Sequence, residues 1–242
     1  MDECVRLNDV GKQFDGKWVF RHLSFTLPTH QTTAIVGESG CGKTTLLQLI
    51  NGVVRVDEGV LSVLNAPIPE IGLATFRRKI GYAVQGAGLF PHLTVQQNVD
   101  LLARLEGWSE SKIQNRVIRL FELMGLDSAL GARYPYQLSG GQQQRVGLCR
   151  AMMLEPPMLL LDEPFSAIDP ITREEIYDHF ETLQQQENVS ALLVTHDLRE
   201  AVRLAQFLVI MGGGQILQHG ETTAVLESPA SDSIRRLIET QL

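Results

Sequence analysis

The stretch Gly37-Glu38-Ser39-Gly40-Cys41-Gly42-Lys43-Thr44 decides the fold of this chain of 242 residues. It matches the phosphate-binding pattern G-x-x-x-x-G-K-[ST] in full. The apolar run Thr32–Val36 before it predicts a buried strand, and a helix is predicted from about Lys43 to Asn51. In such a unit the glycines let backbone N–H groups converge on phosphate oxygens. We therefore expect Lys43 to reach the β- and γ-phosphates of a nucleotide and the Thr44 hydroxyl to ligate Mg²⁺.

A second apolar run, Met158–Leu161, ends in the carboxylates Asp162 and Glu163. A run of this kind predicts a strand buried in a parallel sheet, with its acids at the carboxyl edge, where ligands bind in such folds. Asp162 suits the oxygen shell of Mg²⁺, and Glu163 suits the polarisation of an attacking water. Taken alone, the pair is read as an acidic strand end before Pro164; the phosphate loop favours the catalytic reading.

Two more polar side chains directly follow predicted strands. Gln85 comes after Ile80–Val84, and its amide is expected to touch both Mg²⁺ and the attacking water. His196 comes after Ala191–Thr195, and the same sheet edge would present it to a γ-phosphate. Either residue alone would be weak evidence of a site.

The pentapeptide Leu138-Ser139-Gly140-Gly141-Gln142 places a small hydroxyl and two glycines where a helix can begin. Free backbone N–H groups and the positive end of a helix dipole make this a place to hold a phosphate. The chain therefore has two phosphate-binding elements. They suggest one nucleotide site assembled from two copies, with ATP as a dimer-forming ligand.

Composition narrows the class of protein. A net charge of −7, without a basic stripe, argues against nucleic-acid binding. The three cysteines are scattered, which favours a reducing compartment. The N-terminus lacks the apolar core of a signal peptide, and no apolar run approaches the roughly 20 residues of a membrane span. We expect a chain that does not itself cross a membrane.

Short β-branched runs alternate with helical patterns, which predicts a single α/β domain over residues 1–242. The fold expected is a P-loop NTPase core of mostly parallel sheet, with an antiparallel N-terminal β part and an inserted helical subdomain at roughly 88–155. Val5–Val10 and Val19–Leu27 are the predicted antiparallel strands, with Asp15-Gly16 as their turn. Thr94 and Gln97 predict a capping box that opens a helix.

These motifs occur in the order seen in ATP-binding cassette (ABC) ATPases, and the chain resembles that family over nearly its whole length. The resemblance is carried by Gly37–Thr45, Gln85, Leu138–Gln142, Asp162-Glu163, Ser166-Ala167-Ile168-Asp169 and His196.

The resemblance implies roles for these residues. Lys43, Thr44, Gln85, Glu163 and His196 would form the cis half of the site, together with the rest of the phosphate loop through Thr45. Ser139, Gly140, Gly141 and Gln142 would meet the γ-phosphate of ATP on the opposite subunit, and Asp169 would help to couple the two sites. Phe14 looks like the aromatic that stacks on adenine; the other reading is a half-buried turn residue.

A narrower resemblance is to importer ATPases for quaternary-amine osmoprotectants such as glycine betaine and choline. The chain departs from that group at Gly86, where a second Gln is common, and at Gly212-Gly213-Gly214, where a charged turn is more usual. The segments that carry the resemblance are Gly81–Asn98, Gly107-Trp108-Ser109, Arg133-Tyr134-Pro135, Leu138–Gly147 and Asp169–Arg173.

The resemblance also implies ATP and Mg²⁺ as cofactors and a homodimer or pseudo-dimer of ATPase subunits. Expected partners are transmembrane permease subunits, which would contact the surface around Gln85–Asn98, and an extracytoplasmic substrate-binding protein, with no nucleic acid. The expected location is the cytoplasmic face of the inner membrane, peripheral through the permease. Open alternatives are an importer of another small solute (an amino acid or a polyamine), an exporter cassette, and a non-transport ABC ATPase acting on nucleic acid or the ribosome.

Overall fold

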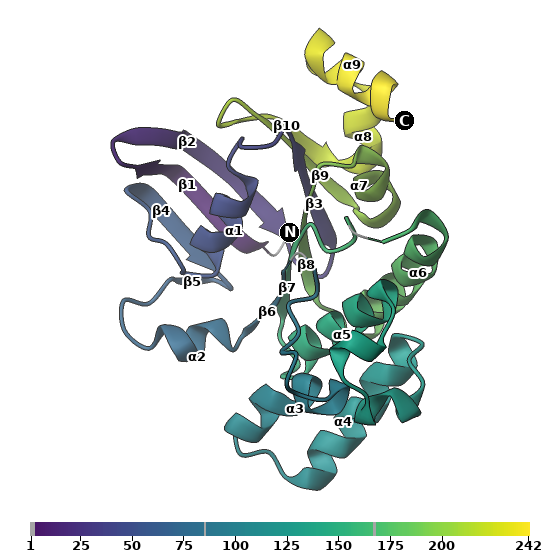
Figure 1. The fold of residues 1–242 in the computed structure, drawn as a ribbon. Helices are drawn as coiled ribbons and strands as arrows, with labels where there is room; N and C mark the ends of the chain where they lie inside the picture. The colour runs from purple at the N-terminus through teal and green to yellow at the C-terminus, as the bar shows by residue number, and fades with distance from the viewer. Residues whose placement is uncertain (1–2, 85, 167) are drawn as a thin grey trace. The chain divides into compact units, whose positions relative to one another are not determined.

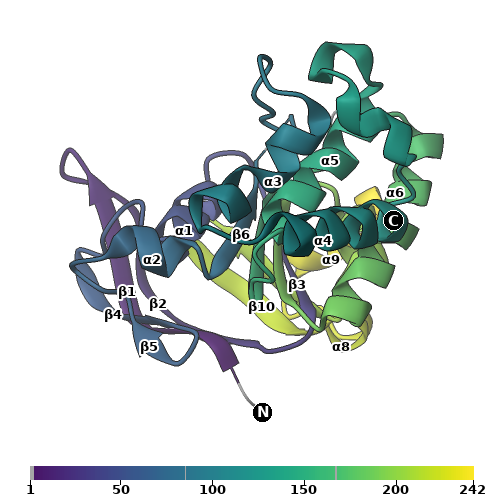
Figure 2. The ribbon, with the colours of Figure 1, turned by 90° about the horizontal axis from the view of Figure 1, so that it is seen from below.

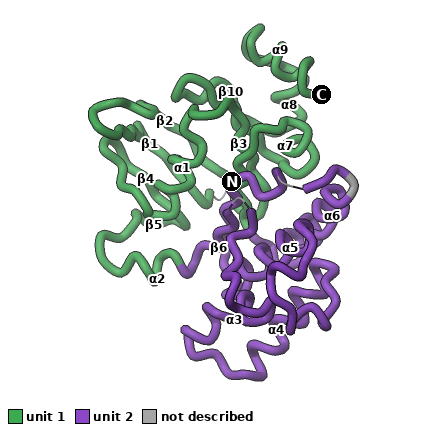
Figure 3. The backbone as a smooth tube through the Cα atoms, in the orientation of Figure 1, with its two compact units in different colours: residues 1–77, 190–242 green, residues 78–189 purple. Residues whose placement is uncertain are grey.

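The computed structural model describes residues 3–84, 86–166 and 168–242, so Gln85 and Ala167 lie outside the described residues. The chain divides into two compact units, which Figure 3 shows in green and purple. Unit 1 comprises residues 1–77 and 190–242, and unit 2 comprises residues 78–189. The predicted helical subdomain at 88–155 falls inside unit 2, which also contains two strands and a long helix. Each unit is described by itself.

Unit 1 contains the predicted antiparallel sheet, in the strand order β2-β1-β4-β5 (Figure 1). The hairpin turn at Asp15-Gly16 is confirmed, because both residues have positive φ, 50° and 75°, as a two-residue type I′ turn requires. Bulges shift the register of β1 against both neighbours. Both strands of the hairpin are longer than the predicted Val5–Val10 and Val19–Leu27. The strands are β1 (Glu3–Phe14), β2 (Lys17–Pro28), β4 (Glu58–Val63) and β5 (Ala66–Pro67).

Unit 1 also contains the strand before the phosphate loop. This strand, β3 (Thr32–Gly37), pairs in parallel with β8 (Ser190–Thr195) on one side and β9 (Phe207–Gly212) on the other. Its residues are buried up to Val36, as expected for a strand covered on both faces. The helix α1 (Lys43–Ile50) begins directly after the loop, with Gly42 as its N-cap. The strand–loop–helix prediction is therefore confirmed.

The rest of unit 1 comprises one further strand and four helices among the described residues. The strand β10 (Gln215–Glu221) pairs antiparallel with β9, and sequence patterning did not predict it. Its residues alternate between exposed and half-buried and none is fully buried, so it carries little hydrophobic signal. The remaining helices are α2 (Leu73–Arg77), α7 (Leu198–Leu204), α8 (Thr222–Glu227) and α9 (Asp232–Gln241).

Unit 2 is built from one parallel strand pair and a group of helices. The strands β6 (Ile80–Ala83) and β7 (Met158–Asp162) pair in parallel, with Ala83 opposite Leu161. Helices α3, α4 and α5 contact one another, as Figures 1 and 2 both show. The helices are α3 (Val95–Leu105), α4 (Glu110–Leu123), α5 (Gly140–Met152) and α6 (Pro170–Glu187), with short 3₁₀ turns η1 (Ser128–Ala132) and η2 (Pro135–Gln137).

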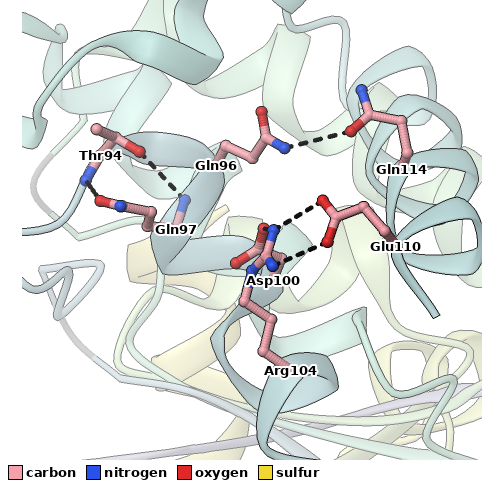
Figure 4. A network of polar contacts seen from close by, with 7 residues as sticks. All are labelled: Thr94, Gln96, Gln97, Asp100, Arg104, Glu110 and Gln114. Carbon is pink, nitrogen blue, oxygen red and sulfur yellow. Dashed lines mark hydrogen bonds and ion pairs between the residues drawn. The ribbon is translucent and has the colours of Figure 1, made fainter. Parts of the chain in front are cut away.

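Polar contacts fix the first two of these helices (Figure 4). The predicted capping box at the start of α3 is confirmed: the Thr94 hydroxyl accepts from the Gln97 backbone N–H, and the Gln97 side chain accepts from the Thr94 N–H. Arg104 then donates to both carboxylate oxygens of Glu110 on α4 and to Asp100 on its own helix. This network sets the corner between α3 and α4.

Candidate functional site

Phe14 and the phosphate loop of unit 1 line one pocket. Phe14 is the last residue of β1, and its side chain is 43% exposed. It shares a hollow of about 570 Å³ with Glu38, Ser39, Gly40 and Cys41, a size typical of small-molecule sites. The aromatic ring of Phe14 therefore lines the same hollow as the loop where phosphates would bind. The Lys12 ammonium lies 5.0 Å from the centroid of this ring, within the range of a cation–π contact. The stacking of Phe14 on adenine stays a prediction.

The loop itself depends on close backbone approach at Gly37. A Cβ at this position would lie 2.3 Å from the Met211 carbonyl oxygen of β9, so no other residue fits without moving that strand. At the other end of the loop, Gly42 has φ 105° and caps α1 without a side chain. The first N–H groups of a helix have no intrahelical partner, so a glycine cap leaves them to be satisfied by a ligand or by solvent.

Lys43 is 6% exposed and turns back over its own loop. Its Nζ donates to the carbonyl oxygens of Gly37 at 2.6 Å and Glu38 at 2.9 Å. These carbonyls compensate a buried ammonium, which would otherwise be costly. Thr44 and Thr45 follow in the first turn of α1, with Thr44 exposed and Thr45 half-buried. The loop thus places a cation and a hydroxyl next to the pocket of Phe14.

His196 lies at the same sheet edge as the loop. It directly follows β8, whose last residue Thr195 pairs with Val36 of β3. Since β3 and β8 are parallel neighbours, their carboxyl ends meet, and the exposed His196 lies beside the strand that leads into the loop. Unit 1 therefore brings Phe14, the residues from Gly37 to Thr45 and His196 to one edge.

In unit 2, Asp162 and Glu163 follow the buried core of β7, and both are half-buried. Burial, the charge of Asp162 and a hydrogen bond with that carboxylate raise the pKa of Tyr82 on β6 to about 12. Tyr82 is therefore a neutral donor that helps to orient Asp162. Glu163 has a positive φ of 45°, a conformation that costs a non-glycine residue roughly 1–3 kcal/mol and is found most often at functional sites.

The pentapeptide Leu138–Gln142 opens α5 (Gly140–Met152), as predicted. Ser139 is the N-cap: its hydroxyl accepts from the Gln142 N–H, and the Gln142 side chain accepts from the Ser139 N–H. Ser139 and Gly140 are exposed. Gly141 is buried, and a Cβ there would lie 2.5 Å from Cγ2 of Thr172 on α6. The two glycines thus have different requirements, with Gly140 open to solvent and Gly141 packed against a helix.

Asp169 caps the next helix. Its side chain accepts from the Thr172 N–H at 3.0 Å, and it is exposed at the start of α6. This capping contact places Asp169 on the helix that packs against Gly141. Unit 2 therefore contains the two acids, the element at Ser139–Gln142 and Asp169, whereas Gln85 lies outside the described residues.

Five residues that line the pocket of Phe14 were not predicted as site residues. The two with a usable signal are Gly213 and Gly214, which belong to the triplet Gly212-Gly213-Gly214. A Cβ at Gly214 would lie 2.4 Å from the Val19 carbonyl oxygen. Nothing in the pattern marks the others, which come from strand β2 and its turn. The five are Lys17, Trp18, Val19, Gly213 and Gly214.

The donor atoms present fit Mg²⁺ and ATP. In unit 1 Thr44 offers a hydroxyl oxygen, and in unit 2 Asp162 offers carboxylate oxygens; hard cations prefer oxygen ligands of both kinds. Among the described residues, no three His, Cys, Asp or Glu side chains form a metal cluster of their own, so such an ion would also need ligands from the nucleotide and water. The pocket of Phe14 and the ammonium of Lys43 fit a base and its phosphates. Over the ranges that the structure covers, no helix has both the length and the apolar character needed to span a bilayer.

Known proteins have sequences similar to this chain. The chain is 39% identical over 235 residues to the glycine betaine/carnitine/choline transport ATP-binding protein of Bacillus subtilis. The aligned region covers 97% of this chain and 62% of that protein. The chain is 41% identical over 236 residues to an Fe(3+) ions import ATP-binding protein of Pectobacterium atrosepticum, with 95% and 66% covered. The chain thus spans less than two thirds of the length of these relatives.

A solved structure agrees with the fold. A dimeric ATP-binding cassette in a post-hydrolysis state, bound to ADP and Pi, superposes with a TM-score of 0.80 at 28% identity, covering 90% of this chain and 98% of that chain. The family model described as ABC transporter matches residues 20–166, which is more than half of the sequence. The chain belongs to the ABC transporter family.

Proposed function

We propose that this chain is the ATP-hydrolysing subunit of an ABC importer and that two copies close around two ATP molecules. The observation that carries the proposal is the pocket of unit 1, which Phe14 shares with Glu38 to Cys41 of the loop. The buried ammonium of Lys43 is bound to the carbonyl oxygens of Gly37 and Glu38 of the same loop. This arrangement suits a purine base at one end and phosphates at the other.

Each residue has a distinct role in the proposal. Lys43 exchanges its carbonyl partners for phosphate oxygens, to which an ammonium binds more strongly. Thr44, Asp162 and Gln85 hold Mg²⁺, which when bound neutralises charge on the phosphates. Glu163 accepts a proton from the attacking water, and His196 contacts the γ-phosphate from the edge of β8.

The second copy completes the site. Gly140 and Gly141 carry the first backbone N–H groups of α5, directly after the exposed N-cap Ser139, and such a helix start is a suitable place for a γ-phosphate. In the proposal these groups meet the ATP held by Lys43 of the partner copy, so that ATP joins two chains and hydrolysis releases them. Asp169, on the helix that packs against Gly141, couples the two composite sites.

The proposed cargo is a quaternary-amine osmoprotectant such as glycine betaine or choline. The relative from Bacillus subtilis supports it, because its name states transport of glycine betaine, carnitine and choline. Transmembrane permease subunits would hold the chain at the cytoplasmic face of the cell membrane, and an extracytoplasmic binding protein would deliver the solute.

A second candidate cargo is another small solute. The relative named for Fe(3+) import is 41% identical to this chain and the glycine betaine/carnitine/choline relative is 39% identical, so percentage identity alone does not choose between these cargoes. Cargo contacts would lie on the permease and the binding protein.

The test is to purify the tagged chain from gently solubilised membranes and then measure solute uptake by vesicles that contain the purified complex. The proposal predicts recovery of a multi-span partner and uptake of labelled glycine betaine or choline that requires enclosed ATP and stops in Glu163→Gln. Uptake of ferric iron or an amino acid instead would overturn the cargo but keep the importer. Recovery of soluble proteins or nucleic acid alone would overturn the importer.

A further inference from the structure

The segment that follows Gln85 has a strained backbone. Gly86, Ala87 and Gly88 have φ values of 73°, 59° and 55°, so three consecutive residues lie in the left-handed region. Ala87 is only 3% exposed, although its side chain disfavours this conformation. Such strain persists where the surroundings determine the conformation. The contacts of this segment therefore identify what holds it.

The main contact is made by Arg150, in the last turn of α5. Its Nη1 donates to the Gly88 carbonyl at 2.8 Å, and its Nη2 donates to the Ala87 carbonyl at 2.9 Å. The guanidinium carbon also lies 5.7 Å from the centroid of the Phe90 ring, within the range of a cation–π contact. A planar guanidinium suits this pair of hydrogen bonds to two neighbouring carbonyls, because its N–H donors have a fixed geometry.

Gly147 allows the helix to approach the segment. It lies three residues before Arg150, on the same face of α5, and a Cβ there would lie 3.2 Å from the Ala87 carbonyl oxygen and 3.4 Å from the Ala87 Cα and Cβ. The segment thus packs directly on the backbone of the helix. Its position follows α5 closely.

The far end of the segment is held by α3. Asn98 is fully buried; its Oδ1 accepts from the Phe90 N–H at 2.8 Å, and its Nδ2 donates to the Phe90 and Leu93 carbonyls at 3.1 Å each. The segment from Gly86 to Phe90 therefore has one anchor on α5 and one on α3. The anchor on α5 matters for the site, because Ser139 is the N-cap of that helix.

We propose that Arg150 is a positioning residue for hydrolysis: it ties the segment after Gln85 to the helix that carries Ser139. Ser139 and Arg150 are joined by one continuous helix of about 16 Å, at a rise of about 1.5 Å per residue. A shift of α5 when Ser139 engages a partner's nucleotide is thereby passed to the segment that directly follows Gln85 in the chain. The inference rests on the proposed roles of Gln85 and Ser139.

The test compares Arg150→Met and Arg150→Lys with Arg145→Met in ATP hydrolysis. Arg145 is the matched control, because it also projects from α5 and donates to two main-chain carbonyls, those of Met124 and Gly125, at 3.3 Å. Arg150→Met should lower kcat by about 10- to 100-fold, because misplacement by about 1 Å has effects of this size. KM for ATP should change by less than about threefold. Lysine should rescue only in part, because an ammonium is a single point charge.

A double-mutant cycle with Gln85→Ala separates this inference from the function on which it rests. If Arg150 acts through Gln85, Arg150→Met should add less than about twofold to the loss in Gln85→Ala. Multiplied losses, or an equal loss in Arg145→Met, would overturn the inference. A normal rate in Gln85→Ala alone would overturn the proposed role of Gln85 instead. If Arg150→Met does not fold, Gly147→Ala displaces the same segment sterically, and the same cycle applies to it.

Discussion

The Lys43 ammonium lies 2.6 Å from the carbonyl oxygen of Gly37, the first residue of its own loop. The loop thus carries an internal partner for the charge that would bind phosphate. Because phosphate oxygens are negatively charged and a carbonyl is not, a nucleotide would replace this contact with a stronger one.

Replacing Lys43 with Met should weaken ATP binding by at least about tenfold, since hydrogen bonds to charged groups contribute about 1.5–3 kcal/mol. The change can be followed by intrinsic fluorescence, because Trp18 lines the pocket. Lys112→Met is the control: Lys112 is exposed in unit 2, over the ring of Trp108. Equal affinity in Lys43→Met and the unmodified chain would show that Lys43 does not bind the nucleotide.

Phe14→Ala should weaken binding of ATP by about 5- to 150-fold, because a stacked aromatic contributes about 1–3 kcal/mol per base. Phe14→Tyr keeps the ring and should retain affinity within about threefold. Calorimetry with ATP and with inorganic triphosphate distinguishes the two ends of the pocket. The loss should vanish for triphosphate, which has no base; a loss of the same size for both ligands would mean that Phe14 supports the loop and does not stack.

Gly141→Ala should destabilise the chain by about 1–3 kcal/mol, because its methyl group would lie 2.5 Å from Cγ2 of Thr172. Adding Thr172→Ser removes that methyl and keeps the backbone N–H that Asp169 binds, so it should restore most of the loss. Gly140→Ala is the control, since nothing lies within 4 Å of a Cβ there. Denaturant titration measures all three variants, and equal losses for Gly140→Ala and Gly141→Ala would contradict this packing account.

The raised pKa of Tyr82 predicts a loss of stability in alkali. Unfolded tyrosine loses its proton near pH 10, whereas burial and Asp162 raise the pKa of Tyr82 to about 12 in the folded chain. The stabilising contribution is therefore complete below pH 10 and is lost as the pH rises from 10 to about 12. It amounts to at most about 3 kcal/mol, at about 1.4 kcal/mol per pKa unit.

Tyr82→Phe should reduce the fall of unfolding free energy over that range. The comparison must be a difference between the variant and the unmodified chain, because burial also raises the pKa of Cys4 to about 11 and of Cys149 to about 12. Urea titrations at pH 9, 10 and 11 supply it. Parallel curves for both proteins would show that Tyr82 is not held neutral by the fold.

Much of the fold follows from local patterns in the sequence. The apolar run of β3, the loop glycines and the capping box at Thr94 each specify their structure over a few residues, and the structure contains all three. The strand β10 and the helix α2 were not predicted, because neither has a fully buried residue and both depend on pairing or packing with distant segments.

Part of the site can also be predicted from local sequence patterns. Residues with a motif, such as Lys43 and Ser139, can be located without coordinates. Trp18 and Gly214 enter the pocket through the hairpin of β1 and β2 and the turn after β9, which come together only in the folded chain. The hydrogen bond from Arg150 to the Ala87 carbonyl likewise joins residues far apart in sequence, and no spacing rule predicts it.

The central claim is that each nucleotide site needs two chains. The most direct measurement is the molar mass of Glu163→Gln by light scattering with ATP and Mg²⁺, together with the bound nucleotide per chain. The account predicts a pair of chains holding two ATP molecules, and a return to single chains when Ser139→Glu is added, because its carboxylate would repel the γ-phosphate. Single chains that bind ATP fully at every protein concentration would contradict it.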